Sequence, residues 1–430
     1  MTGASAVVIR GGRVIDVTGS RQADVAMQGG MITAVEPSIS AGPGVQVLDA
    51  GGCVVAPGFV DLHTHLREPG REEAETVESG ARAAVLGGFT AIVAMPNTEP
   101  AMDCAAVVSQ VLELGRTAPC EVAVAAAITV GRRGEQLSPM AELAALGVKL
   151  FTDDGAGVQD PRLMRRAMEY SRTLGITLAQ HCEDAALASG GHMHEGAWSS
   201  RLGIPGIPAE AEELMVMRDI TLCRLTGAPI HFLHLSTAGS IAMVGAAKAQ
   251  GLPVTAEAAP HHFTLTDAMA QSFDPVFKVN PPLRSDADVR AVRRGLADGS
   301  IDAIATDHAP HEQEAKEAPW DEAPPGMLGL ETALGLAIGE LGLPIEKVLA
   351  LLSWQPAAIA GLGARHGGPI LAGRPANLTV FDPEEQWMVD PSRLASRSRN
   401  TPYAGRTLTG RVRHTVVAGE PVVVASEAQR

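Results

Sequence analysis

The sequence lacks several features that would each mark a particular class of protein. No apolar stretch approaches the ~18 residues that suggest a membrane-spanning helix, and the N-terminus has no basic segment followed by a long apolar one, as an export signal would. The chain also has no long basic run, and its 34 basic and 49 acidic residues give a net charge of -15. Nucleic acid and anionic membrane surfaces are therefore not expected partners, because phosphate binding needs clustered lysine and arginine.

Cysteine is scarce as well. The chain has 5 cysteines, an odd count, and none of them forms a Cys-x-x-Cys pair. This usage is typical of reduced thiols rather than of a disulfide framework, and it predicts a cytoplasmic protein.

The chain divides into terminal segments of one texture and a central segment of another. With 430 residues, 46% of them hydrophobic, it can bury a core large enough for a barrel-sized domain and a smaller one. We predict that residues 1–57 and 368–430 pair into one composite β-domain, and that residues 58–367 form the larger domain. Short strands between glycine turns are expected in the terminal segments at Ala6–Arg10, Arg13–Asp16, Met31–Val35, Ala376–Asp382 and Arg411–Glu420.

Between the two ends, apolar strands alternate with alanine-rich helical segments, as in a βα array. Eight such units predict an α/β fold, a (β/α)8 TIM-type barrel, whose chemistry lies at the carboxyl ends of its strands. The segment 311–325, rich in glutamate and proline, is expected to be a long loop and a candidate lid. The expected strands are Val54–Leu62, Ala91–Met95, Val122–Ile128, Val148–Phe151, Thr177–Ala179, Ile230–Leu233, Val254–Ala258 and Ala303–Ala305.

Side chains that can ligate a metal recur at the ends of these strands. His63 and His65 are two residues apart in a strand, so their imidazoles lie on one face. His181, His234 and Asp307 end the fifth, sixth and eighth expected strands. A histidine that ends one strand is usually a hydrogen-bonded core residue, but four histidines and an aspartate at one end of a barrel need a common cause. A metal centre supplies that cause, and a divalent ion such as zinc suits these ligands.

A centre with two metal ions would also need an anionic bridge to offset the repulsion between the cations. The fourth strand offers three candidates, which are Asp153, Asp154 and a carboxylated Lys149, and the pattern alone does not choose among them. Arg67 follows the His-x-His pair on the same side, where a cation could hold an anionic substrate. Glu257 on the seventh strand either lines the barrel mouth or pairs with a cation.

The motifs of the chain resemble those of the dihydroorotases of the amidohydrolase superfamily, in particular the bacterial class I type. The resemblance spans essentially the whole chain, and the motifs occur in the family's order. The matching runs are Pro57–Gly70, Ala94–Thr98, Phe151–Gly155, Gln180–Asp184, His234–Ser236, Val279–Arg284, Ala305–His311 and Pro325–Glu331.

This resemblance implies a (β/α)8 barrel flanked by a small composite β-sandwich domain. It also implies a zinc centre that holds one or two ions, with two Zn²⁺ expected per chain. It implies that the bridge is Asp154, although Lys149 lies where related cyclic amidases keep a carboxylated lysine. The implied ligands are His63 and His65 for a buried ion, His181 and His234 for a more exposed one, and Asp307, which would also shuttle the proton.

The resemblance further implies the reversible cyclisation of N-carbamoyl-L-aspartate to L-dihydroorotate in de novo pyrimidine biosynthesis. A metal-activated hydroxide would attack the ring amide carbonyl, with Asp307 as general acid and base. From the family we also expect a homodimer and an association with aspartate transcarbamoylase. The implied substrate contacts are His65, Arg67, Asn97, Asn280, His311 and the backbone near Pro325 and Gly326.

Other polar residues are predicted to lie outside the metal set. Strand alternation points Cys182 away from the metal, while His262 and His308 are expected to support the ligands or the structure. His192 and His194 form a second His-x-His pair, but in a glycine-rich stretch that is expected to be solvated surface.

Two rival functions remain open on the sequence. One is another cyclic amidase, such as a hydantoinase or allantoinase, which Lys149 favours and which Arg67 and Asn97 argue against. The other is a non-catalytic partner of aspartate transcarbamoylase, which is disfavoured because every ligand position is kept.

Overall fold

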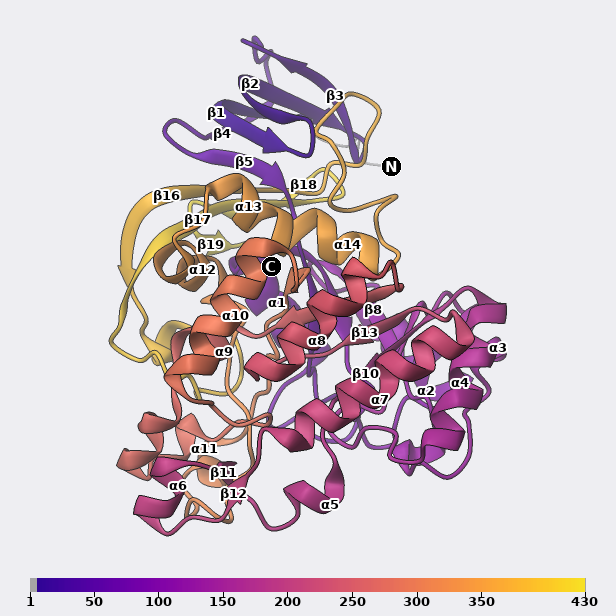
Figure 1. Cartoon of the computed structure of the whole chain (residues 1–430). Helices are drawn as coiled ribbons and strands as arrows, with labels where there is room; N and C mark the ends of the chain where they lie inside the picture. The colour runs from indigo at the N-terminus through magenta and orange to yellow at the C-terminus, as the bar shows by residue number, and fades with distance from the viewer. Residues whose placement is uncertain (1–5, 430) are drawn as a thin grey trace.

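The structure, a computed structural model, describes residues 6–429 and contains two large sheets (Figure 1). One is a parallel sheet wound into a barrel, and the other is a mixed sheet to which both ends of the chain contribute. In Figure 1 the indigo N-terminal strands and the yellow C-terminal strands lie together, and the magenta to orange helices cover the barrel. The predicted (β/α)8 barrel with a separate β-domain is confirmed.

The barrel closes through side chains as well as through its backbone. A parallel bridge between Thr64 and His308 brings the end of the last strand back to the first. The Asp61 carboxylate reinforces this closure because it accepts hydrogen bonds from the N–H and the hydroxyl of Thr306, both at 2.7 Å. In the described part of the chain the barrel consists of β6 (Phe59–Thr64), β7 (Phe89–Ala94), β8 (Glu121–Ala126), β9 (Leu150–Phe151), β10 (Thr177–Gln180), β13 (Ile230–Phe232), β14 (Val254–Ala258) and β15 (Ala303–Ile304).

Strands from the two ends of the chain meet in the mixed sheet. Its order is β19-β18-β17-β16-β5-β1-β2-β3, with β4 beside β1, so that C-terminal β16 pairs antiparallel with N-terminal β5. The domain boundaries at residues 57 and 368 stay a prediction. Within residues 6–429 the sheet comprises β1 (Val7–Asp16), β2 (Gly19–Gln28), β3 (Met31–Glu36), β4 (Gln46–Asp49), β5 (Val54–Pro57), β16 (Leu378–Met388), β17 (Thr407–Val417), β18 (Glu420–Val424) and β19 (Glu427–Ala428).

Several expected strands have other bounds in the structure, and the run expected over 411–420 divides between β17, which ends at Val417, and β18, which begins at Glu420. Two further differences lie at glycines. The two short strands expected before residue 17 are one strand, β1, whose register against β2 shifts between Ile9 and Gly12. The run expected as one strand over 54–62 divides at Gly58 into β5 and β6, which belong to different sheets. A Cβ at Gly58 would lie 2.1 Å from Thr90 Cγ2, so the close approach of the chain to β7 requires glycine here.

Helix α4 (Pro161–Leu174) shows how the sequence defines the outer layer. Asp160 caps its N-terminus by accepting hydrogen bonds from two backbone N–H groups, and Gly175 ends it with a φ of 64°. Leu163, Ala167 and other residues at helical spacing are buried against the barrel. The remaining helices that flank the barrel are α1 (Val77–Leu86), α2 (Ala105–Gly115), α3 (Met140–Ala145), α7 (Glu210–Thr226), α8 (Ala238–Ala249), α10 (Asp286–Asp298), α12 (Ala333–Leu341), α13 (Ile345–Leu349) and α14 (Gln355–Ile359).

Short helices and strands lie in the loops at the carboxyl end of the barrel. They follow β10, β14 and β15, and they lengthen the loops at that end. No helix among residues 6–429 combines the length and apolarity needed to cross a bilayer. The short elements are α5 (Ala185–Ala188), β11 (Met193–His194), α6 (Ala197–Leu202), β12 (Gly206–Ile207), α9 (Pro260–Thr264), η2 (Asp267–Ser272), η3 (Pro275–Phe277) and α11 (Gln313–Lys316).

The barrel interior is filled by small and branched apolar residues. Ala91, Ala125, Ala179 and Ala303 form one buried cluster with Leu150 and its neighbours inside the barrel. The larger side chains, such as Phe89 and Phe151, belong to the cluster shared with the helices. The apolar packing gives way to histidines and carboxylates at the carboxyl ends of the strands.

Candidate active site

His63 and His65 reach the barrel mouth through an irregularity in β6. The register of β6 against β7 shifts between Asp61 and Thr64, where three residues of β6 face two of β7. Leu62 therefore belongs to the apolar barrel cluster, although it directly precedes a histidine of the mouth. Simple alternation along the strand predicted the shared face of the two histidines but not this bulge.

Hydrogen bonds fix the ring orientation of both histidines. His63 Nδ1 donates to Glu257 Oε1 at 3.0 Å, and His65 Nδ1 lies 2.9 Å from the Asn97 side-chain oxygen. The Nε2 atom of each ring then carries the free lone pair. Glu257 also accepts from His231 Nε2 at 3.0 Å, so its carboxylate is fully engaged. The sequence left the role of Glu257 open, and the structure places it behind His63.

Asp154 lies at the centre of four histidines. Its Oδ1 atom is 3.4 Å from His63 Nε2, 3.6 Å from His181 Nδ1 and 3.5 Å from His234 Nε2. Its Oδ2 atom is 3.6 Å from His65 Nε2. One carboxylate thus faces the imidazoles from three different strands.

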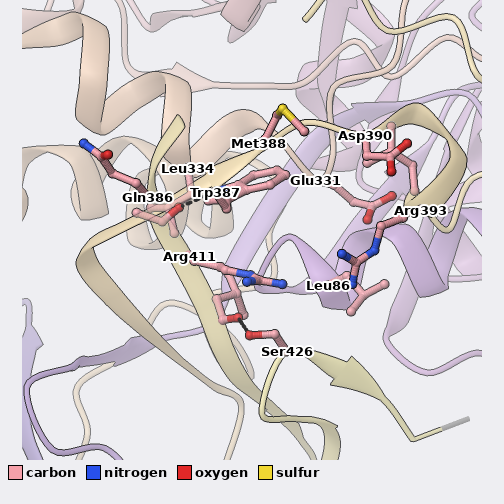
Figure 2. Close-up of a pocket in the computed structure, with 13 residues that line it drawn as sticks. Leu86, Glu331, Leu334, Gln386, Trp387, Met388, Asp390, Arg393, Arg411 and Ser426 are labelled. Atoms are coloured by element: carbon pink, nitrogen blue, oxygen red, sulfur yellow. Dashed lines mark hydrogen bonds between the residues drawn. The ribbon is translucent and has the colours of Figure 1, made fainter. Parts of the chain in front are cut away.

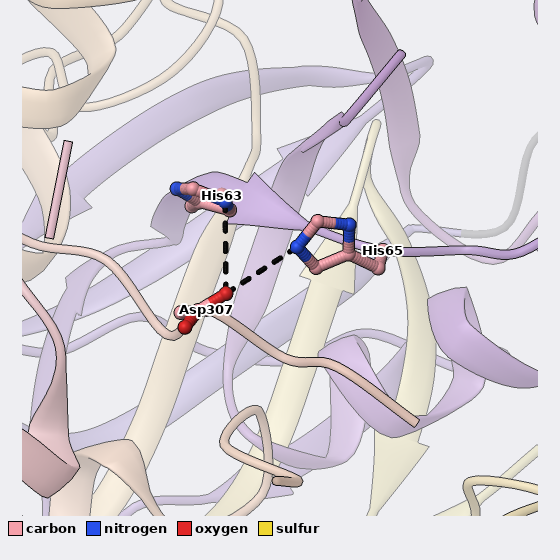
Figure 3. A group of neighbouring side chains, drawn as sticks. All are labelled: His63, His65 and Asp307. Carbon is pink, nitrogen blue, oxygen red and sulfur yellow. Dashed lines mark ion pairs between the residues drawn. The ribbon is translucent and has the colours of Figure 1, made fainter. Parts of the chain in front are cut away.

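Asp307 closes the same cluster from the end of β15 (Figure 3). Its Oδ1 atom lies 3.3 Å from His65 Nε2 and 3.6 Å from His63 Nε2. Asp307 and His234 have φ angles of 46° and 31°, which L-residues adopt rarely outside strained functional positions. The carboxylate therefore faces the histidine pair.

His181 Nδ1 lies 3.0 Å from His234 Nε2, but the distances from the histidines to Asp154 and Asp307 suit a metal ion better than direct hydrogen bonds. Four ligands at 2.0–2.1 Å around a tetrahedral ion lie about 3.3 Å apart, close to the observed separations. His63 Nε2 and Asp154 Oδ1 are buried without a hydrogen-bond partner among residues 6–429. Two sets of potential ligand atoms converge there, one from His63, His65 and Asp307 and the other from His63, Asp154 and His234.

Both aspartates are held in the ionised form. Burial raises the pKa of Asp154, but His63, His181 and His234 outweigh burial and keep that pKa well below its usual value. Burial likewise raises the pKa of Asp307, and His65 and His63 lower it far more. Each carboxylate is thus available at neutral pH as a ligand or as a base.

The two other bridge candidates lie elsewhere. Lys149 is exposed and precedes β9, so it lies at the opposite end of the barrel, where a Cβ added at Gly361 would lie 3.1 Å from Lys149 Cγ. The idea that a carboxylated Lys149 bridges the metals is therefore wrong. Asp153 is buried but engaged, because it accepts hydrogen bonds from the Thr129 N–H at 3.0 Å and from the Thr129 hydroxyl.

Arg67 and His311 form a polar wall beside the cluster. Arg67 is buried, and its Nε donates to the Pro310 carbonyl at 3.1 Å. His311 Nε2 donates to the Pro325 carbonyl at 2.8 Å and so cannot also accept from Arg67 NH2, which lies 3.5 Å away. Burial and Arg71 lower the pKa of Arg67 to about 10, which leaves the guanidinium charged at neutral pH. Its terminal N–H groups can therefore meet an anion.

The remaining predicted substrate contacts lie at the same end of the barrel. Asn97 is fixed by His65, and Asn280 Oδ1 is buried with no hydrogen-bond partner in the described chain. Gly326 has a φ of 144°, and a Cβ there would lie 2.7 Å from His311 Nε2, so glycine is required beside this imidazole. The structure thus leaves the Asn280 amide oxygen free and packs Gly326 against His311.

The prediction that the second His-x-His pair lies on the solvated surface is wrong. His192 and His194 are half-buried rather than solvated. His194 Nδ1 accepts from Arg284, and the His192 carbonyl accepts from the Trp320 indole N–H at 3.1 Å. This pair packs the β11 excursion against other loops.

The other polar residues lie as expected, outside both ligand sets of the described chain. Cys182 is buried, and burial raises the pKa of its thiol well above the usual value. His262 Nε2 donates to the Pro281 carbonyl, and His308 Nε2 pairs with Glu75 at 3.2 Å. Glu75, buried and bonded also to Ser396, was not singled out from the sequence, because a glutamate in a loop carries no distinctive pattern.

A separate hollow lies far from this chemistry. It has a volume of about 330 Å³ and is lined by Glu331, Trp387, Arg411 and others (Figure 2). Two of its polar side chains are engaged, since the Trp387 indole donates to the Gly410 carbonyl and Arg411 pairs with Glu385 at 3.0 Å. No residue of the histidine and aspartate cluster lines it.

Comparison with known proteins gives the family of the chain. The Dihydro-orotase-like family matches residues 52–240. The chain is 47% identical to the dihydroorotase of Streptomyces coelicolor, over 98% of this chain and 99% of that protein. It is also 47% identical to the dihydroorotase of Pelotomaculum thermopropionicum, over 97% and 98% of the two chains.

Solved structures with the same fold are more distant in sequence. The L-hydantoinase (dihydropyrimidinase) from Arthrobacter aurescens superposes with a TM-score of 0.88 at 24% identity, over 99% of this chain and 97% of that one. A D-hydantoinase from a Thermus species gives 0.85 at 25% identity, over 98% and 96%. These structures support the barrel fold, while the full-length relatives show that the chain belongs to the dihydroorotase family.

Proposed function

We propose that the chain interconverts N-carbamoyl-L-aspartate and L-dihydroorotate with two zinc ions bound at the mouth of the barrel. Its family makes it a cyclic amidohydrolase of pyrimidine biosynthesis that acts on a small molecule. The observation that carries the metal-dependent part is the convergence of four histidines on Asp154 at 3.4–3.6 Å. Imidazole and carboxylate are ligands that suit zinc.

The ligands divide around Asp154. We assign His63, His65 and Asp307 to one ion and His181 and His234 to the other, with the Asp154 carboxylate between them. A divalent ion bound there polarises a carbonyl oxygen and lowers the pKa of water to about 7. The ionised aspartates offset the charge of two cations, and Glu257 keeps His63 in the tautomer that ligates through Nε2.

Arg67 supplies the substrate's main anchor in this proposal. Its planar guanidinium can hold the carboxylate of dihydroorotate through two N–H donors. Asn97 and the neutral His311 complete the carboxylate contact, while Asn280 and the backbone at Pro325 and Gly326 face the ring. Burial, Arg67 and Lys316 lower the pKa of His311 to about 2, so this imidazole adds no second charge.

Asp307 moves the proton. In hydrolysis it takes a proton from the attacking water as the new C–O bond forms, and it gives that proton to the ring nitrogen as the C–N bond breaks. In the biosynthetic direction Asp307 removes a proton from the carbamoyl nitrogen as the C–N bond to the side-chain carboxyl carbon forms. Asp307 then returns this proton to the carboxyl hydroxyl, which leaves as water when the C–O bond breaks. No serine or cysteine nucleophile is required.

The cellular compartment and the assembly of the protein are also part of the proposal. The 5 cysteines are all unpaired, which fits a reducing cytoplasm. A homodimer and an association with aspartate transcarbamoylase are proposed from the family resemblance alone.

Turnover of dihydroorotate, followed by loss of its absorbance, tests the proposal. The protein is expected to hydrolyse dihydroorotate but not hydantoin, and Asp307→Asn is expected to lower kcat by about 10²- to 10⁴-fold. Turnover of hydantoin would favour a cyclic amidase of the hydantoinase type instead. Bound zinc without turnover would favour a scaffold that needs aspartate transcarbamoylase.

A further inference from the structure

Lys316 is a buried lysine in the segment between His311 and Gly326. Its side chain belongs to α11 and is only 8% exposed as a residue. The ammonium donates to three backbone carbonyl oxygens, those of Pro324 at 3.0 Å, Gly326 at 3.0 Å and Lys278 at 3.3 Å. The ammonium therefore links the loop that contains Lys278 to the segment that contains Pro324 and Gly326.

Burying a charged ammonium costs free energy, and the three hydrogen bonds to carbonyl oxygens offset part of that cost. Burial, together with Lys278, lowers the pKa of Lys316 to about 7, while Asp274 acts in the opposite direction. Lys278 fastens the same segment, because its Nζ donates to the carbonyls of Trp320 at 2.6 Å and Asp321 at 3.1 Å. Two lysines thus hold one segment through its backbone oxygens.

The bonds of Lys316 bracket the peptide that faces the proposed substrate. Pro324 and Gly326 lie on either side of Pro325, whose carbonyl accepts the hydrogen bond from His311 Nε2. The Gly326 N–H donates to the Lys278 carbonyl at 2.9 Å, which ties the same peptide to the loop after β14. A shift of this peptide would therefore move both Gly326 and His311.

We propose that Lys316 is a positioning residue for substrate binding, because its ammonium fixes the Pro325–Gly326 peptide and the His311 imidazole beside Arg67. The inference rests on the proposed function, since that function assigns His311, Pro325 and Gly326 to the substrate. These groups contact the substrate away from the reacting bond. Their displacement therefore weakens binding of the substrate and of the transition state by similar amounts. The predicted signature is a change in KM rather than in kcat.

Lys316→Met tests this signature on the metal-loaded protein. KM for dihydroorotate is expected to rise about tenfold, with kcat within about threefold of wild type. Lys248→Met is the matched control, because Lys248 also donates to a carbonyl, that of Gly299, but lies away from the mouth and pairs with Asp302. An unchanged KM, or a loss of kcat alone, in Lys316→Met would overturn the inference.

Hydrogen exchange of the protein without substrate separates this inference from the proposed function. Amides of residues 311–328 are expected to exchange about tenfold faster in Lys316→Met and at the wild-type rate in Lys248→Met. Absence of dihydroorotate turnover in the wild type would contradict the proposed function. An unchanged rate of amide exchange in Lys316→Met would contradict the positioning role of Lys316. If Lys316→Met does not fold, Lys316→Gln, which keeps an N–H donor, is measured in the same way and is expected to show smaller changes of the same sign.

Discussion

The two ends of the barrel differ in how closely their histidines, lysines and carboxylates pair with one another. At the amino end, His366 lies between the Thr90 hydroxyl at 2.9 Å and Glu121 at 2.8 Å, and Lys248 pairs with Asp302 at 2.6 Å. At the carboxyl end, imidazole nitrogens approach Asp154 and Asp307 no closer than 3.3 Å.

The difference separates groups that stabilise the fold from groups that are arranged to bind something else. A histidine and a carboxylate at 2.8 Å satisfy each other, so they need no further partner. In the site, His181 bonds to His234 and His63 to Glu257, both at 3.0 Å, but no imidazole comes that close to Asp154 or Asp307. The unpartnered His63 Nε2 and Asp154 Oδ1 atoms are left facing each other. The comparison predicts that changes at the carboxyl end affect metal and turnover, while changes at the amino end affect stability.

Asp154→Asn should give the largest effect, because it removes the charge that four histidines share. We expect the chain to lose bound zinc and kcat/KM to fall by at least about 10³-fold. Metal analysis and the dihydroorotate assay on one sample measure both quantities. Asp153→Asn is the matched control, since it disturbs a neighbouring aspartate that bonds to Thr129; equal metal loss in both variants would contradict the assignment.

Glu257→Gln should weaken the centre less. The carboxylate fixes His63 through Nδ1, and loss of such support lowers metal affinity by about 10- to 100-fold. Competition with a chelator measures the affinity, and excess zinc should restore most of the turnover. Unchanged zinc affinity would mean that Glu257 serves only to keep His63 and His231 packed.

Glu121→Gln should alter stability and leave the chemistry alone. Burial raises the pKa of Glu121, but hydrogen bonds from His366 and Arg365 outweigh it and lower the pKa to about 2. A lowered pKa stabilises the fold above the ordinary value of 4.5, and that contribution disappears as the pH falls toward 2. Melting curves should therefore show a deficit of about 2 kcal/mol at pH 6 that narrows at pH 3, while turnover at pH 7 stays unchanged.

Lys149→Met should have the smallest effect. The side chain is exposed at the amino end, so turnover and zinc content should stay within about twofold of wild type. A large loss of zinc in this variant would revive the carboxylated lysine and the hydantoinase-like alternative.

Sequence reasoning predicted the barrel and most of the converging residues for one reason. Parallel strands of a barrel end on the same side, so His181, His234 and Asp307 had to meet once the strands were recognised. It could not choose between Lys149 and Asp154, because these flank the two-residue strand β9 and only its boundaries reveal which end each one faces. The β6 bulge and the carbonyl contacts of Lys316 depend on pairing between distant segments, which no local pattern encodes.

Anomalous diffraction at the zinc absorption edge, from crystals of the zinc-loaded protein, tests the central claim most directly. The account predicts two peaks, one among His63, His65 and Asp307 and one beside His181 and His234. Each should lie within about 2.2 Å of an Asp154 carboxylate oxygen. A peak at Lys149, or no peak within reach of Asp154, would contradict it.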